Sequence, residues 1–441
     1  ARIAPSETAI RTPVVERAPG TPCTERLYCL RPVNAPSAPP QNVSPPGPGA
    51  WLLDTSHLTT SCSRYHQPLW MDAFPRGFSE CLRKYGSLLE ALDWAWLEGF
   101  PYYRISPVAA PEGATEHPPR EVWDELMTTH PDVQERLANA EHAFANRIWR
   151  EELDHWDRID KPGAIAEHRR LLAVDPNALE RDGLVAYLEE CTNNVIRGVY
   201  LHHIHNMAAF IPTGDLIAQG TRMTGGSDAA ILELLKGSTP DALGVGHLRE
   251  RLREAAAKPD VKRLLSSDDA AGALEQIEDL PGPAGDVLRE VVAFIAYRPV
   301  NGEDVGDTCA FEIPELVLGG IVAELDEPAG DPAREAVQRD ELTDAIRSEV
   351  DPSERDRFDD VLADARFAYR IREERAMYGD LWSYGVARRA LIAAGVRLLE
   401  EGRIEGRAHL VEASWPEVRA ILEGKGGPDG GELAERARYR A

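Results

Sequence analysis

Apolar residues recur at helical spacing along most of this 441-residue chain, from Trp51 almost to its end. Short segments rich in Pro and Gly, such as DKPG, VDPN, GSTP and LPGPAG, separate these stretches and would end one helix before the next begins. Convincing strand-type alternation is almost absent, and no repeat of fixed period is visible. The pattern predicts an all-α fold. The expected helices span residues 72–99, 130–157, 178–209, 227–236, 241–256, 284–297, 312–324, 332–349, 353–378 and 380–402.

Proline content divides the chain into three regions. Residues 1–48 are rich in Pro, Ala and Ser and end in NAPSAPPQNVSPPGPGA, which favours an extended arm or linker. Residues 49–428 are expected to form one large multi-helix domain with a central small-molecule pocket, followed by a C-terminal tail over 429–441. The hydrophobic fraction of 43% is sufficient for a core of that size.

Charge and cysteine usage narrow the possible partners. The net charge of −25 argues against nucleic acid or an anionic membrane, since both require a basic surface. No apolar run approaches the roughly 18 residues of a membrane span, and the first residues lack the apolar core of a secretory signal. The six cysteines are scattered and include no C-x-x-C pair. A cytoplasmic protein without membrane contact is therefore expected.

The stretch GVYLHHIHNMAAFIPTGD (198–215) places three histidines in an apolar segment. On a helix beginning near Leu184, His202 falls on the apolar stripe, His205 and Asn206 lie close beside it, and His203 points well away. Hydrogen-bonded core histidines and a substrate-contacting acid/base pair both remain open. A metal site is the third alternative, but spacing identifies no third ligand, and no metal ligands are assigned.

A second polar stripe lies in RFDDVLADARFAYRIREERAMYGDLWSYGVARRALIAAGVRLLE. Its apolar face includes Tyr369 and continues into Arg372 and Glu373 and, if the helix is unbroken, into Asp380. Charges on a core-facing stripe require partners. The stripe is therefore either a structural Arg–Glu network or the polar floor of a substrate pocket.

The same segment contains DDVLAD, Asp359 to Asp364. A D-D-x-x-x-D run on a helix can hold Mg²⁺ against a diphosphate, as in helical prenyl-chain enzymes. The matching second motif is not recognisable, and acidic runs are common in a chain with 74 acidic residues. A solvated helix face is the preferred interpretation.

Several segments together resemble the central substrate-binding domain of rifampicin phosphotransferase-like proteins, within the phosphoenolpyruvate-utilising enzymes. The resemblance begins at GAWLLDTSHLTTSCSRYHQPLWMDAFPRGFSECLRKYG, with Trp51, Asp54 and His57. It continues through WREELDHW, LLAVDPNALERDGLVAYLEEC, YLHHIHNMAAFIPTGDLI, TGGSDAAILELLKGSTP, YRPVNGEDVGDTCAFEIPELVL and REERAMYGDLWSYGVARRALIAAGVRLLEEGRI. Order and spacing suit the family over roughly 50–425, although no single motif is specific.

The resemblance implies a phosphoryl relay of which this chain carries one part. In the family, an ATP-grasp unit binds ATP, a swivelling domain carries a phosphorylated histidine, and the helical domain holds the acceptor hydroxyl. The Ser/Thr-rich histidine loop with its ARE-x-G-x-P-like run is absent here, as is a Lys/Arg-rich ATP-grasp unit, and the chain has only six lysines. No cofactor is therefore expected on this chain. ATP and Mg²⁺ would enter only through a separate ATP-grasp or phosphohistidine protein.

Three functions follow as hypotheses. The preferred one is a small-molecule enzyme or enzyme component of specialised metabolism, which binds a bulky, mostly apolar substrate and acts as a stand-alone lyase, isomerase or cyclase through acid/base chemistry. The alternatives are the acceptor-binding subunit of a split phosphotransferase and a non-catalytic ligand-binding or self-resistance protein. The catalytic candidates are His202, His205, Glu373 and Asp380. The substrate-binding candidates are Asn206, Arg298, Tyr369, Arg372, Tyr384, Arg388 and Arg389.

Overall fold

The computed structural model describes residues 44–55, 57–58, 60–110, 119–238, 246–326 and 332–440, without the side chains of 332–336. The arm expected over 1–48 lies outside the described residues except for 44–48. The described residues belong to one compact unit. Nearly all regular structure in it is helical, so the expected all-α class is confirmed.

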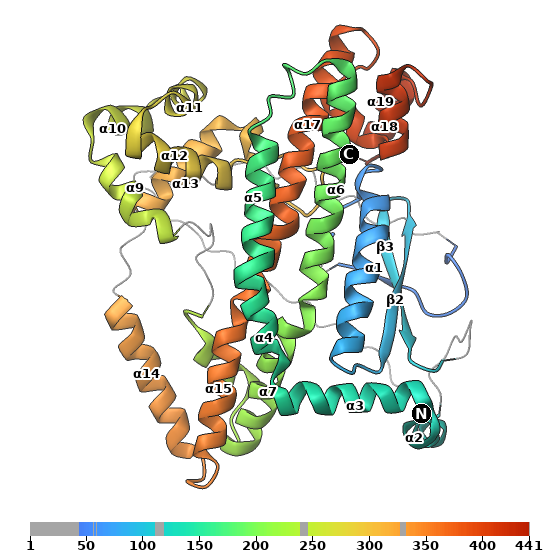
Figure 1. Ribbon diagram of the computed structural model, residues 1–441, viewed down its shortest axis with the longest axis vertical. Coiled ribbons are helices and arrows are strands. Elements are labelled where there is room, and N and C mark those ends of the chain that lie inside the picture. Colours follow the sequence, from blue (N-terminus) through green and yellow to red (C-terminus); the bar gives the residue numbers. More distant parts are fainter. Residues whose placement is uncertain are drawn as a thin grey trace, which may run out of the picture. The chain divides into compact units, whose positions relative to one another are not determined.

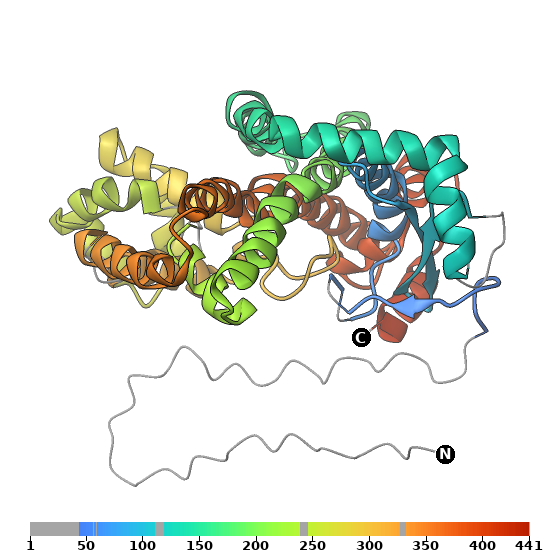
Figure 2. The same ribbon diagram turned by 90° about the horizontal axis from the view of Figure 1, so that it is seen from below.

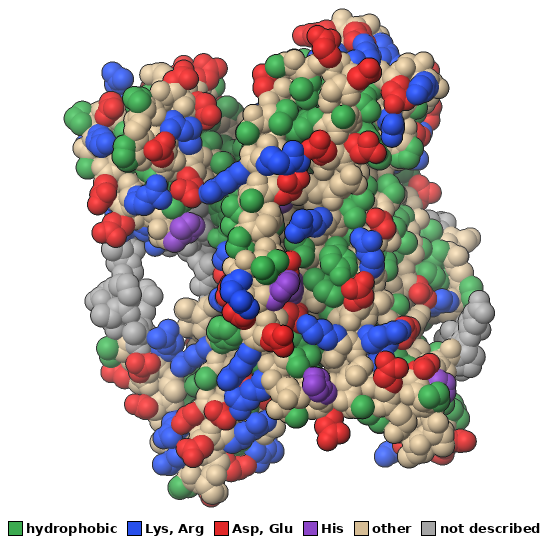
Figure 3. Space-filling view, in the orientation of Figure 1, with side chains coloured by type: hydrophobic (Ala, Val, Ile, Leu, Met, Phe, Trp, Pro, Cys, Tyr) green, Lys and Arg blue, Asp and Glu red, His purple; other side chains and the backbone are tan. Residues whose placement is uncertain are grey.

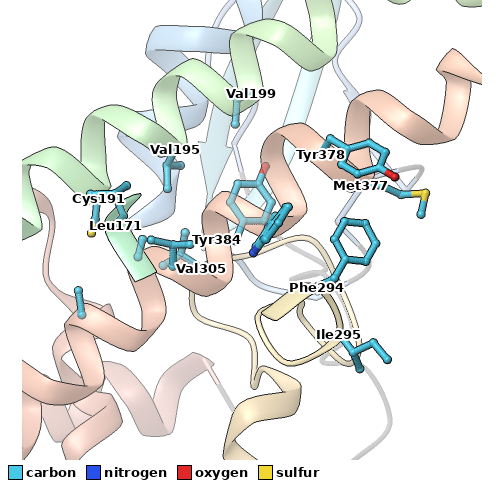
Figure 4. Packing of buried hydrophobic residues seen from close by; sticks show 14 of the residues in the cluster. Leu171, Cys191, Val195, Val199, Phe294, Ile295, Val305, Met377, Tyr378 and Tyr384 are labelled. Atoms are coloured by element: carbon cyan, nitrogen blue, oxygen red, sulfur yellow. The ribbon is translucent and has the colours of Figure 1, made fainter. Parts of the chain in front are cut away.

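Helix α6 (Arg181–Ile204) is the central element. It contacts α1 (His66–Lys84), α17 (Leu381–Glu400) and the π-helical turn η5 (Ala376–Asp380), and Figure 1 shows it between α1 and α17. Because neighbours cover several of its sides, α6 is buried well beyond one stripe. Figure 4 shows this packing, with Val195 and Val199 of α6 facing the same core as Tyr384 of α17.

The helix expected over 72–99 is wrong in its second half. Helix α1 ends at Lys84, and β2 (Leu89–Leu97) and β3 (Phe100–Pro107) form an antiparallel hairpin, with β1 (Leu52–Leu53) on the other side of β3. Glu98 and Gly99 both have positive φ, 53° and 81°, which suits the two-residue turn that joins twisted strands. The aromatic residues around this turn, including Trp94 opposite Tyr103, favour strand pairing over helix continuation.

The helical segments that follow the hairpin break at identifiable residues. Arg147 has φ 50° and separates α3 (Pro131–Asn146) from α4 (Ile148–His155), which passes through a second π-helical turn, η1 (Trp156–Asp160), into α5 (Lys161–Leu172). His205 separates α6 from α7 (Asn206–Thr224). The expected helix over 353–378 becomes α15 (Arg355–Tyr369), α16 (Ile371–Arg375) and η5.

The remaining elements form the periphery. Helices α9 to α13 pack on one another, and their yellow and orange colours mark them in Figures 1 and 2.

The segment expected as a tail is instead helix α19, which buries Leu433 and Ala434. The part of the chain that the structure describes contains no helix that is both long and apolar enough to cross a bilayer. The peripheral elements are α2 (Arg120–Thr129), α8 (Asp228–Leu232), η2 (Glu233–Leu235), η3 (Gly246–Leu248), α9 (Arg249–Ala256), α10 (Pro259–Leu265), α11 (Ala270–Glu278), α12 (Gly282–Ile295), η4 (Ala310–Glu312), α13 (Pro314–Asp326), α14 (Pro332–Glu349), η6 (Arg407–Glu412), α18 (Trp415–Glu423) and α19 (Gly430–Arg440).

Candidate functional site

His202 and Asp380 form a buried pair between α6 and η5. The Nδ1 atom of His202 lies 2.7 Å from Oδ2 of Asp380, although the two residues are 178 positions apart in the chain. A close approach of the backbones makes this possible, since a Cβ atom at Gly198 would lie only 2.8 Å from the carbonyl oxygen of Gly379. Glycine one turn before His202 therefore brings the helix against the turn that carries Asp380.

Burial acts on both members of this pair. It raises the pKa of Asp380 to about 7. The hydrogen bond that the carboxylate accepts from the backbone N–H of Leu381, at 3.0 Å, acts in the opposite direction and lowers the pKa. Burial, together with the charges of Arg375 and His57, lowers the pKa of His202 well below its usual value. The imidazole is therefore held neutral at pH 7. With Nδ1 directed at Asp380, its Nε2 receives no hydrogen bond from any described residue, and 11% of the side chain stays accessible.

His57 and Asp54 form a second imidazole–carboxylate pair in the segment before α1. Their Nδ1 and Oδ2 atoms are 2.7 Å apart, and the His57 side chain is 29% exposed. Burial works against charge on His57, but the hydrogen bond to Asp54 and the charges of Glu303 and Asp380 outweigh it and raise the pKa. The His57 ring lies edge-on to Trp70 and Phe74, with centroids 5.4 and 6.0 Å away.

Glu303 completes the cluster from the loop between α12 and η4. Burial raises its pKa to about 7, and the charge of Asp380 acts in the same direction. The loop is held by the next residue, Asp304, which accepts hydrogen bonds of 2.6 Å from both the backbone N–H and the hydroxyl of Ser63. Two carboxyls that titrate near neutrality and two imidazoles therefore meet in one place.

The prediction that His203 points away from the core is wrong. Its side chain is fully buried, its ring stacks on His202 at 4.5 Å, and its centroid is 4.0 Å from that of Phe74 and 6.1 Å from that of His57. His203 is buried because α1 covers the side of α6 that a one-sided helix would expose to water. Asn206, buried as expected, lies 3.4 Å from Nδ1 of His203.

His205 is buried as expected, but its partners differ from those of His202. Its Nδ1 and Nε2 atoms each lie 3.0 Å from a carboxylate, of Glu152 and Asp160 respectively. Although burial opposes the charge, these two hydrogen bonds raise its pKa, so that the ring is a doubly donating imidazolium. Both ring nitrogens are engaged, which suits a structural link between α4, η1 and the α6–α7 junction.

The expectation that Arg372 and Glu373 turn inward is wrong. Both side chains are about half exposed, at 52% and 50%, whereas the next two residues, Glu374 and Arg375, are buried. The helix is interrupted at Arg370, just before these residues, and its phase changes there, so the inward face shifts by two positions. Asp380 nevertheless faces inward, as expected.

The other substrate-binding candidates are dispersed. Tyr384 is fully buried beside the cluster, with its hydroxyl 3.4 Å from Asp380. Arg388 is also buried, but it pairs with Glu312 and donates to the carbonyls of Val305 and Gly306. Three candidates lie elsewhere: Arg389 donates to the Leu172 carbonyl, Arg298 lies over the Phe294 ring, and Tyr369 packs with the α7–α15 core.

The acidic run over 359–364 is neutralised by arginines. Asp359 pairs with Arg347, Asp360 with Arg147, and Asp364 is buried with Arg147 and Arg150 beside it. Within the described ranges, no group of three or more His, Cys, Asp or Glu side chains is arranged to hold a metal ion. Figure 3 likewise shows acidic and basic side chains interspersed over the visible face.

Four residues of the cluster are not among the predicted site residues: Asp54, His57, Glu303 and Arg375. The spacing of Asp54 and His57, three positions apart in DTSH, was the available signal for one pair. Glu303 stands in the Gly- and Asp-rich loop NGEDVGD, where only tertiary packing shows which acid is held against the histidines. No protein-family model matches this chain, and no curated protein matches it.

Proposed function

We propose that this chain is a small-molecule enzyme that moves protons within its substrate, as an isomerase or a dehydrating lyase. One observation carries the proposal: two imidazole–carboxylate pairs meet in one cluster, and their surroundings displace the two imidazole pKa values in opposite directions. A cationic His57 and a neutral His202 at the same pH are the protonation states of a general acid and a general base.

The division of labour follows from the hydrogen bonds. Asp380 orients His202, so that Nε2, which receives no hydrogen bond from a described residue, takes a proton from a C–H or O–H group of the substrate. Asp54 orients His57, whose other ring nitrogen gives a proton to a neighbouring carbon or to a departing hydroxyl. The substrate leaves either as an isomer, with its atoms conserved, or as a dehydrated product together with one water molecule.

The rings around His57 support a bulky, mostly apolar substrate. Trp70, Phe74 and Trp94 surround the imidazole at centroid distances of 5.4 to 6.5 Å. Substrate would approach across the accessible side of His57, because His202 is the more deeply buried of the two.

Isotope exchange tests this function even where the product is unidentified. The protein is incubated in D₂O, without ATP or metal, with a panel of apolar alcohols and ketones, and mass spectrometry follows deuterium uptake. We expect a time-dependent mass increase that His202→Gln and His57→Gln reduce by about 100-fold or more, as for loss of a general base or acid. His142→Gln, an exposed histidine outside the cluster, is the matched control.

The outcomes separate the alternatives. Exchange that survives both cluster variants refutes the assigned roles. A compound that binds tightly but is recovered unlabelled and unchanged instead supports a non-catalytic ligand-binding protein.

A second candidate, phosphorylation of an acceptor hydroxyl, is favoured by Arg375. This guanidinium is 5% exposed, donates to the His202 carbonyl at 3.1 Å, and has no carboxylate within ion-pair distance among the described residues. Burial lowers its pKa to about 10, which leaves a cation at pH 7 beside the neutral base. A base next to a buried cation suits an acceptor hydroxyl that receives a phosphoryl group.

The resemblance to rifampicin phosphotransferase-like proteins suggests how such a reaction would be supplied. A separate protein with ATP-grasp and phosphohistidine units would provide the phosphoryl group from ATP and Mg²⁺. Radiolabelled ATP should then label a small molecule only when both proteins are present, and Arg375→Gln should abolish the transfer. Transfer by this chain alone would contradict the split arrangement.

A further inference from the structure

A cavity of about 750 Å³ lies away from the histidine cluster. The turn of the β2–β3 hairpin, the segment 61–67 that leads into α1, and helix α19 enclose it, at the side of the molecule where α19 and the hairpin appear in Figure 1. His57, His202 and Asp380 are not among the residues that line it. Its volume is in the range of cavities that hold a drug-sized molecule.

Carboxyl groups outnumber guanidinium groups around this cavity. Three arginines contribute to the lining, and two of them also interact with acidic residues just outside it. Arg436 pairs with Glu417, and Arg440 lies 3.8 Å from the buried Asp304. Against these three cations stand six carboxyl groups, four in the lining and two behind it. They are Glu98, Glu412, Glu432, Glu435, Glu417 and Asp304.

Two of these carboxylates are free to receive a cation. Glu435 forms no ion pair with any other described residue, and the carboxylate of Glu98 accepts one hydrogen bond within the described ranges, from the hydroxyl of Tyr439 at 2.6 Å. The one lining arginine without an ion pair within the described ranges is Arg64, whose side chain is exposed at the rim. Arg436 and Arg440 are engaged with the lining acids Glu432 and Glu412, and the lining has one carboxyl group more than it has guanidinium groups.

Aromatic and apolar side chains line the same cavity. Trp96 and Leu97 border it at the end of β2, where their side chains point to opposite faces of the sheet, and Tyr439 borders it from α19. A carboxylate beside the face of Trp or Tyr is the combination that recognises organic ammonium groups, because ring and carboxylate both attract the cation while the ring accommodates its apolar body.

We propose that this cavity binds an organic ammonium compound with an aromatic or other apolar body. Its ammonium group pairs with Glu435 and Glu98, and its apolar body lies against Trp96. The site is independent of the proton-transfer function proposed above, since it uses none of the residues of the histidine cluster.

Calorimetric titration with three probes of one shape tests the charge requirement. We use 2-phenylethylammonium, the neutral 2-phenylethanol and the anionic 3-phenylpropionate at physiological salt, where unspecific attraction to the acidic surface is screened. The ammonium compound is expected to bind at least about tenfold more tightly than the alcohol, and the carboxylate not at all. Glu435→Gln and Glu98→Gln should each weaken ammonium binding about fivefold.

Two further variants make the test specific. Glu341→Gln removes one exposed carboxylate on α14, away from the cavity lining, and should leave the affinity unchanged. Tyr439→Ala removes a 66% exposed ring, so that a fold defect is not expected, and should weaken binding. Equal losses in Glu341→Gln and Glu435→Gln, tighter binding of the anion, or no heat of ammonium binding at concentrations of about 10 mM would each overturn the proposal.

Discussion

Replacing Gly198 with alanine is expected to push α6 away from the turn that carries Asp380. A Cβ atom at this position would lie 2.8 Å from the Gly379 carbonyl oxygen, 2.9 Å from the Ser383 hydroxyl and 3.0 Å from Cα of Asp380. Two of these three atoms belong to the backbone, so rotation of a side chain cannot relieve the clash. The helices must separate by a few tenths of an ångström.

The magnitude follows from a matched substitution. Overpacking of a close interface costs about 1–3 kcal/mol, whereas alanine in place of glycine inside a helix stabilises by about 1 kcal/mol. Gly214 in α7 is exposed, and an added Cβ would have nothing within 4 Å. Gly214→Ala therefore reports only the stabilisation that alanine gives inside a helix. Subtraction cancels that term, and Gly198→Ala should be less stable than Gly214→Ala by about 1–3 kcal/mol.

Urea unfolding followed by circular dichroism measures this difference, and nitrogen NMR of the His202 ring reports the site directly. Because His202 lies one turn after Gly198 on the same face, its hydrogen bond to Asp380 should lengthen and its Nδ1 resonance should shift in the Gly198 variant only. Equal stability of the two alanine variants, with an unchanged His202 ring, would refute the close approach of α6 to η5.

Three other predictions concern charge. His205→Gln should lower the free energy of unfolding by about 3 kcal/mol at pH 6. Because the folded-state pKa of His205 is raised, its stabilising effect is complete below about pH 6.5 and is lost as the pH rises through the folded-state pKa. Urea unfolding should therefore show a smaller effect of the substitution at pH 9. Arg388→Met should destabilise by about 3 kcal/mol because it leaves the largely buried carboxylate of Glu312 without a cation, with only the backbone N–H of Cys309 as a donor among the described residues. Arg389→Met loses one bond to a backbone carbonyl and should cost about 1 kcal/mol. NMR titration should find the pKa of His57 above its usual value, and Asp54→Asn should lower it.

Each of these has a contrary result. If the loss of unfolding free energy in His205→Gln grew with pH, the buried ring of His205 would be neutral. Similar losses for the two neighbouring arginine variants would remove the distinction between the buried ion pair and the surface-side contact. If Asp54→Asn leaves the pKa of His57 unchanged, a group other than Asp54 sets that pKa.

The positions of the helices were predictable where the local signals were strong. The expected helix over 332–349 matches α14, and those near 284–297 and 312–324 match α12 and α13 within a few residues. Proline and capping residues mark these boundaries in the sequence itself, so no distant contact is needed to place them. The hairpin after α1 was missed because its aromatic strands also fit a helical pattern over a short window, and strand pairing depends on a partner.

The chain alone determined that long amphipathic helices dominate and that His202, His205 and Asp380 are buried, because the apolar periodicity around each residue is local. Tertiary structure decided which of them meet: His202 joins Asp380 because Gly198 lets the two backbones approach, whereas His205 joins Glu152 and Asp160. It also brought His57 and Glu303 to the same place from distant segments. Which polar groups share a site depends on packing between elements, and a periodic pattern within one element does not contain that information.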